Sequence, residues 1–108
     1  MTYTATYNRA PLRRGDTLLG WCVDIDVAGQ PAQLLSARLQ LRTNNGRLVY
    51  DWPVTVEGRR IQLPDVPAAT TTGWPVGVLL YDLEVTLVDG RVATWLQGEQ
   101  SVLADRSY

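Results

Sequence analysis

Histidine, lysine and phenylalanine are absent from this chain of 108 residues, and all ten basic residues are arginine. Without histidine, the commonest general base, the commonest transition-metal ligand and the Ser–His and Cys–His catalytic pairs are excluded. Without lysine, there is no amine for a Schiff base and no lysine for a phosphate-binding loop. The sequence therefore predicts a protein that is not an enzyme, with no cofactor and no metal.

Other features are also scarce. Cys22 is the only cysteine, so no intrachain disulfide can form, and we expect synthesis in a reducing cytoplasm. A net charge of −1 and a pI of about 5.2 give no electrostatic footprint for nucleic acid. No apolar run is long enough to cross a membrane, and the segment 1–10 lacks the pattern of a signal peptide. We therefore expect neither nucleic acid nor membrane as a partner.

The main pattern in the sequence is an alternation of apolar and polar residues. Hydrophobic residues make up 45% of the chain and charged residues 19%, which predicts one globular domain spanning residues 1–108. The apolar residues recur with a period of two and are interrupted by turn residues, as in half-buried β-strands.

The clearest alternation spans residues 78–98. Asp89 and Gly90 form a dipeptide that favours a two-residue type I′ turn, which predicts a β-hairpin. The register that follows pairs residues of one face: Leu87 with Val92, Val85 with Thr94, and Leu83 with Leu96. Trp95 is then expected on the opposite, more polar face.

Further strands are predicted along the rest of the chain. They span residues 17–26, 35–43, 47–52 and 59–63, with an edge strand at 3–7 and a long proline-containing loop at 64–77. In two of them the apolar residues share a face: Leu19, Trp21, Val23 and Ile25 in one, and Leu35, Ala37, Leu39 and Leu41 in the other. Six or seven short antiparallel strands predict an all-β, immunoglobulin-like antiparallel β-sandwich. A small Greek-key barrel is the alternative.

Two motifs have a possible chemical meaning. Arg14, Gly15 and Asp16 form the tripeptide of integrin ligands, but they directly precede a predicted strand, so we interpret them as its entry turn. Pairs of alternating carboxylates, Asp24 with Asp26 and Asp82 with Glu84, could bind Ca²⁺ or act as acid and base. They are more typical of the solvated face of a sheet. Cys22 is expected to be a buried, inert thiol.

The four tryptophans are the remaining candidates for a site. Trp21 shares the apolar face of its strand and is expected in the core. Trp52 and Trp74 each precede a proline, and Trp95 lies on the polar face of the hairpin. Such tryptophans either cover sheet edges or anchor a partner. We take Trp52, Trp74 and Trp95 as candidate protein-interface residues. A sugar-stacking surface is a further use of exposed tryptophan.

Three segments together resemble a known pattern: "RRGDTLLGWCVDID", "GQPAQLLSARLQLRT" and "GVLLYDLEVTLVDGRVATWLQGEQSVLAD". The pattern is similar to small tailed-phage virion proteins, and in particular to the N-terminal β-sandwich domain of siphophage upper baseplate proteins. The resemblance implies a virion location and a docking role without catalytic residues. It also implies that other virion proteins are partners and that the chain forms a homo-oligomer or ring.

Two functions follow as hypotheses. The first is a non-enzymatic bacteriophage structural protein, an assembly, adaptor or decoration module, with the tail, baseplate or fibre attachment favoured over the head. The second is a carbohydrate- or cell-surface-binding β-sandwich module. The first expects an oligomer, whereas the second expects a monomer that responds to oligosaccharides.

Overall fold

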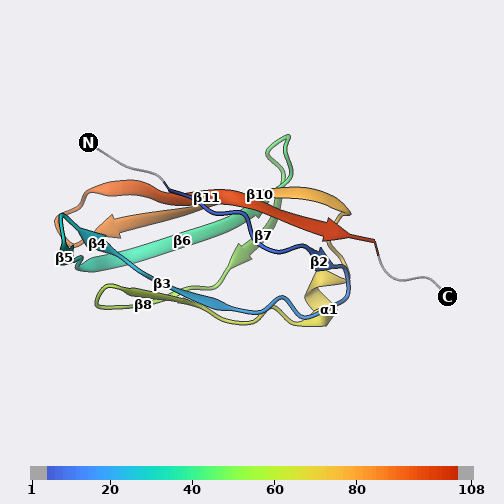
Figure 1. Cartoon of the computed structure of the whole chain (residues 1–108), viewed down its shortest axis with the longest axis horizontal. Coiled ribbons are helices and arrows are strands. Elements are labelled where there is room, and N and C mark those ends of the chain that lie inside the picture. Colours follow the sequence, from blue (N-terminus) through green and yellow to red (C-terminus); the bar gives the residue numbers. More distant parts are fainter. Residues whose placement is uncertain (1–4, 105–108) are drawn as a thin grey trace.

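The chain forms an elongated sandwich of two β-layers, with extents of 52 × 25 × 20 Å (Figure 1). The structure is a computed structural model that describes residues 5–104. The larger sheet is the upper layer in Figure 1, and β3 and β8 of the smaller sheet lie below it.

The larger sheet has the strand order β1–β11–β10–β6–β7, and β2 also pairs with β11. Its strands are β1 (Ala5–Thr6), β2 (Leu12–Arg13), β6 (Leu34–Arg42), β7 (Leu48–Trp52), β10 (Gly77–Leu87) and β11 (Val92–Leu103). β1 and β2 run parallel to β11, whereas the other neighbours are antiparallel. The N-terminal segment therefore forms one edge of a mixed sheet.

The smaller sheet has the order β3–β9–β8 and is antiparallel. Its strands are β3 (Trp21–Asp24), β8 (Thr55–Glu57) and β9 (Arg60–Leu63). A short hairpin of β4 (Asp26–Val27) and β5 (Gln30–Pro31) extends from it. The segment predicted as a long loop contains one helical turn, α1 (Ala68–Thr71), near the opposite end of the molecule.

The predicted β-sandwich is confirmed, although it has more strands than expected, and β11 extends to Leu103, beyond the predicted hairpin. Residues 5–104 contain eleven strands, and four of these have only two residues. Such short strands follow turn residues closely and carry too little alternation to be recognised from the sequence.

The β10–β11 turn differs from the predicted type I′ turn. Gly90 has a φ of 93°, whereas Asp89 does not have a positive φ. The Gly90 amide donates to the Leu87 carbonyl at 2.9 Å, and the Leu87 amide donates to the Arg91 carbonyl at 2.8 Å. The loop therefore has three residues and ends in a left-handed glycine, a common alternative to the two-residue turn.

The longer loop shifts the register near the turn. Val85 pairs with Ala93 rather than with Thr94, so the prediction is wrong there. Further along the hairpin, Leu83 pairs with Leu96 as predicted. The register shift between these two regions leaves Trp95 as the extra residue of a β-bulge, which compensates for the longer loop.

The core lies between the sheets and consists of aliphatic and aromatic side chains. Its fully buried members include Ile25, Leu39, Leu41, Ile61, Leu83 and Val85. Two leucines that were predicted to share these faces are exposed. Leu19 is 67% exposed because β3 begins only at Trp21, and Leu35 is 64% exposed because it lies at an irregularity of β6, where Leu34 faces the core instead.

Candidate functional site

Two of the three candidate interface tryptophans are buried. Trp52 is 2% exposed, and its indole N–H donates to the Pro64 carbonyl at 2.7 Å. Trp74 is 4% exposed and lies 5.4 Å from Tyr50, measured between ring centroids. The expectation that these two side chains are exposed is therefore wrong. Position before a proline did not indicate exposure, because Trp52 pairs with Leu39 on the core-facing side of the sheet.

Trp95 is intermediate between buried and exposed. It is half-buried and packs against the core, because the β-bulge places it outside the regular alternation of β11. Only part of its side chain is open to a partner.

Trp21 belongs to an aromatic cluster at the edge of the sandwich. Its ring lies 5.6 Å from that of Tyr7 and 6.0 Å from that of Tyr81. The Arg9 guanidinium lies 4.7 Å from the Trp21 ring centroid and 5.3 Å from that of Trp52, within cation–π distance of both. Burial lowers the pKa of Arg9 from its usual value.

This cluster was missed in the sequence, because Arg9 belongs to the N-terminal segment and meets Trp21 only through the fold. Its Nη2 group donates to the Leu19 carbonyl at 3.0 Å. Cation–π contact and this hydrogen bond attach the N-terminal segment to the smaller sheet. The cluster therefore has a structural role.

The tripeptide Arg14–Gly15–Asp16 forms a turn that packs against α1. The Gly15 amide donates to the Thr71 hydroxyl at 3.1 Å, and that hydroxyl lies 2.7 Å from the Asp16 carbonyl. Arg14 donates to the Trp74 carbonyl at 3.4 Å. Because these bonds fix the turn against the body of the protein, it is not the protruding loop tip of an adhesion ligand.

The carboxylate pair on β3 and β4 is neutralised by arginines. Asp24 accepts two hydrogen bonds from Arg60, at 2.9 and 3.2 Å, and Asp26 accepts one from Arg59 at 2.7 Å. The hydrogen bond from Arg60 lowers the pKa of Asp24. Within residues 5–104, no group of three or more Cys, Asp or Glu side chains is arranged to hold a metal ion.

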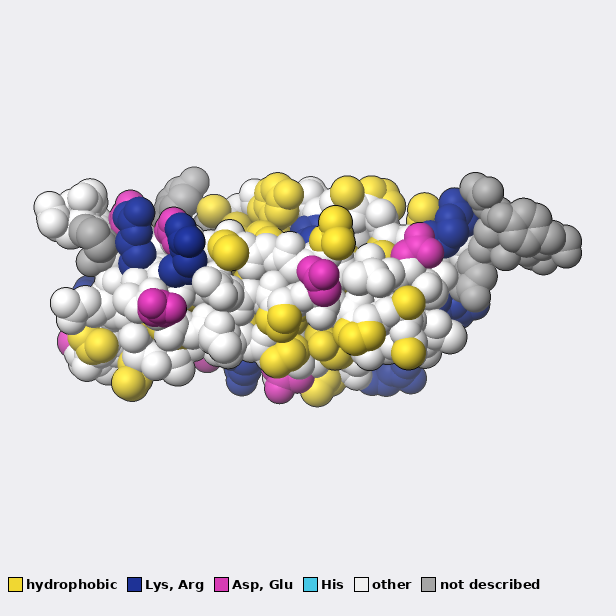
Figure 2. Space-filling view, turned by 90° about the horizontal axis from the view of Figure 1, so that it is seen from below, with side chains coloured by type: hydrophobic (Ala, Val, Ile, Leu, Met, Phe, Trp, Pro, Cys, Tyr) yellow, Lys and Arg dark blue, Asp and Glu magenta, His cyan; other side chains and the backbone are white. Residues whose placement is uncertain are grey.

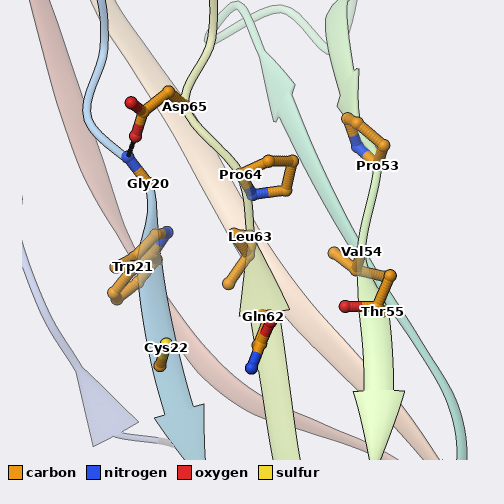
Figure 3. Close-up of a pocket in the computed structure, with 10 residues that line it drawn as sticks. All are labelled: Gly20, Trp21, Cys22, Pro53, Val54, Thr55, Gln62, Leu63, Pro64 and Asp65. Carbon is orange, nitrogen blue, oxygen red and sulfur yellow. Dashed lines mark hydrogen bonds between the residues drawn. The ribbon is translucent and has the colours of Figure 1, made fainter.

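An open hollow of about 500 Å³ lies on the smaller sheet (Figure 3). It is bordered by the segment 20–22 on one side and by Pro53, Val54 and Thr55 on the other, with the segment 62–65 between them. Figure 2, seen from the side of this sheet, shows apolar side chains gathered over the middle of the face. The hollow is thus a mainly apolar surface depression.

Gly20, just before β3, is fixed in place at the edge of the hollow. Gly20 lies against backbone, since a Cβ there would meet the Leu63 carbonyl oxygen at 2.1 Å. The Asp65 carboxylate accepts a hydrogen bond from the Gly20 amide at 2.7 Å, so it is already paired. Cys22 is exposed, and the prediction of a buried thiol is wrong because Cys22 is on the outward face of β3.

No helix in the described part of the chain is long and apolar enough to span a membrane.

Comparison with known proteins gives a likeness in fold. No protein-family model matches the chain, and no match was found among curated proteins. A solved structure that it resembles is that of CopC from Methylosinus trichosporium OB3b. The TM-score is 0.56 with 14% sequence identity, over 93% of this chain and 90% of that chain. At this identity the likeness concerns the fold alone, and it agrees with the β-sandwich.

This finding contradicts the resemblance to phage baseplate proteins, because the matching structure is not a phage protein. The motifs that suggested the resemblance are turn signals. Gly15 lies in the turn fixed by Thr71, and Gly90 ends the β10–β11 loop. Turns of this kind occur in many β-proteins, so they do not identify a family. The predicted virion location and virion partners rested on this resemblance.

Proposed function

We propose that this protein is a non-enzymatic, self-assembling structural module. In this proposal, the hollow on the smaller sheet receives an exposed apolar hairpin end from a second copy of the chain. The observation that carries the proposal is the occurrence of both surfaces, an apolar depression and an apolar protrusion, on one molecule.

The hollow suits an uncharged apolar group. Pro53, Val54 and Pro64 contribute apolar surface, and the Asp65 carboxylate is paired with a backbone amide. Leu19 adjoins the hollow through Gly20 and is 67% exposed. An exposed apolar surface of this kind is typical of a contact site between proteins.

The protrusion is the end of the larger sheet at the β10–β11 turn, on the left in Figure 1. Leu35, Val88 and Val92 are 64%, 58% and 58% exposed. They lie around Thr86, which pairs with Val92 on one side and with Ser36, next to Leu35, on the other. Together they form an apolar patch that water solvates poorly, beside the exposed Asp89–Arg91 ion pair of the turn.

Joining two different surfaces gives a heterologous contact. Such a contact propagates from copy to copy and forms a ring when the rotation closes, or a filament when it does not. A contact made by one hairpin end is small, so we expect weak association that depends on protein concentration. The absence of histidine and lysine from the chain agrees with an assembly role rather than catalysis.

Sedimentation velocity at increasing concentration tests this function. We expect wild type to associate, and Val88→Asp and Thr55→Arg each to remain monomeric. Mixing the two variants should restore one-to-one dimers, because one keeps the hollow and the other keeps the hairpin end. Val78→Asp, which changes a valine 46% exposed elsewhere on the larger sheet, is the control and should associate normally. Wild type that stays monomeric would refute the proposal.

A further inference from the structure

A row of polar side chains crosses the outer face of the larger sheet. The register places one residue of each strand in line, from β7 to β1: Asp51, Gln40, Asp82, Gln97 and Thr6. Their strand neighbours, such as Leu39, Leu41, Tyr81 and Leu83, are buried, so the row faces outward. Adjacent members are spaced by the distance between strands, ~4.8 Å.

Four members of the row, Gln40, Asp82, Gln97 and Thr6, lie in a concave part of the surface. Two hollows of about 380 and 280 Å³ adjoin each other over Leu80 and Gln97, which line both. Thr6 and Asn8 border one side, and the turn between β6 and β7, with Asn44, borders the other. Figure 1 shows this turn standing out above the sheet. We call the combined depression the polar trough.

The floor of the trough has an apolar part beside the polar row. Leu80 is 41% exposed, and it pairs with Arg42 on one side and with Glu99 on the other. A ligand in the trough therefore contacts a C–H surface below and polar groups along one side.

Several polar groups of the trough are available for a ligand. Arg42 donates to the Gln40 side-chain oxygen at 2.5 Å and to the Gly46 carbonyl at 3.1 Å. This contact orients the Gln40 amide and leaves its N–H groups open. In the part of the chain that the structure describes, no hydrogen bond engages the side chains of Asp82 or Gln97. Amide and carboxylate groups present paired donors and acceptors.

We infer that the polar trough binds a neutral oligosaccharide laid across the strands. Vicinal hydroxyls each donate and accept, so they suit the planar amide and carboxylate groups of Gln40, Asp82 and Gln97. A linear oligosaccharide repeats its hydroxyls at intervals comparable to the strand spacing, and the C–H face of a sugar ring matches Leu80. A concave site with a few placed polar groups is the usual form of a small-ligand site.

The charge of the trough selects against acidic ligands. Asp82 and Glu99 contribute carboxylates, whereas the guanidinium of Arg42, which also lines the trough, is engaged with Gln40 and Gly46. Uronic acid polymers and nucleic acids would meet repulsion here. Tyr81 lines both hollows but is only 4% exposed, so it offers a sugar ring little surface for stacking. We therefore expect weak binding, with dissociation constants roughly in the millimolar range.

The inference goes beyond self-assembly and does not depend on it, because it uses a different surface. The test is titration of the ¹⁵N-labelled full-length chain with cellohexaose and with maltohexaose, followed by amide chemical shifts. We expect at least one of them to shift Gln97, Gly98 and the Gln40 side-chain amide. Asp82→Ala and Gln97→Ala should each weaken binding at least about fivefold, and Thr86→Ala, on the same face of β10, less than about twofold.

Three outcomes would overturn the inference. One is the absence of shifts with both neutral oligosaccharides at millimolar concentrations. Another is shifts confined to the hollow of the smaller sheet. The third is binding of oligogalacturonate in preference to both neutral oligosaccharides. Loss of self-association with retained shifts would refute only the assembly function.

Discussion

At the scale of single residues, the Thr71 hydroxyl has a large effect for its size. It is fully buried, accepts from the Gly15 amide and lies within hydrogen-bond distance of the Asp16 carbonyl. Thr71→Val keeps the shape of the side chain and leaves these backbone groups unpaired. We expect the free energy of unfolding in urea to fall by about 1–3 kcal/mol.

Thr72 is the matched control for this change. Its hydroxyl donates to the Ala68 carbonyl at 2.9 Å, but the residue is exposed, so water can replace the bond. Thr72→Val should cost less than about 0.5 kcal/mol. An equal loss in both variants would contradict the role assigned to Thr71.

The buried Tyr81 should make the free energy of unfolding decrease at alkaline pH. Burial raises its pKa to about 12, although the Arg9 charge opposes the shift, and its hydroxyl donates to the Tyr7 carbonyl. In the unfolded chain a tyrosine has a pKa of about 10. The unfolded state therefore loses its proton first, and the stabilisation, complete below about pH 10, is lost as the pH rises towards 12.

Unfolding in urea across this pH range checks the prediction. The free energy of unfolding should decrease by an amount of the order of 2 kcal/mol between about pH 10 and 12. In Tyr81→Phe the decrease should be smaller, although not absent, because burial also raises the pKa of Tyr50. The same slope in both proteins would mean that Tyr81 ionises equally in the folded and unfolded states.

At the scale of elements, the N-terminal segment from β1 to β2 lies along β11, and we call it the strap. The amides of Tyr7 and Arg9 donate to β11 carbonyls, and the buried Gln100 donates to the Ala10 carbonyl at 2.8 Å. The strap lies so close to Gly98 that a Cβ there would be 1.7 Å from the Tyr7 carbonyl oxygen. Only glycine allows this approach.

Gly98→Ala should therefore displace the strap rather than unfold the sandwich. We expect faster hydrogen exchange at the Tyr7 and Arg9 amides and a stability loss of about 1–3 kcal/mol. Gly73→Ala is the control, because a Cβ at Gly73 would meet nothing closer than 3.8 Å. Unchanged exchange in Gly98→Ala would show that the strap adapts to the added methyl group.

The strands illustrate what a sequence pattern can and cannot predict. Alternation indicated β10, β11 and the pairing of Leu83 with Leu96, because these depend on neighbouring residues. It misplaced Leu35, since an irregularity of one residue reverses the face of a side chain. The polar trough was not predictable, because its row joins five strands from distant parts of the chain, including β1 and β7.

At the scale of the whole molecule, the shape is elongated. The radius of gyration of the Cα atoms is 14.8 Å. A compact domain of about this length has a value of about 13 Å. The length separates the polar trough, which lies in the middle of the larger sheet, from the hairpin end at Val88. Occupation of one surface therefore leaves the other accessible.

The parallel pairing of the N-terminal strap with β11 also has a mechanical consequence. Because both run in the same direction, the described chain starts beside the middle part of β11, at Leu96, and finishes beyond the far end of that strand (Figure 1). A force that pulls these ends apart loads the hydrogen bonds between the strap and β11 in shear, together rather than one after another. Forced unfolding is governed by the unfolding rate, so this shear geometry is expected to resist pulling at these ends more than a geometry that breaks the bonds one at a time.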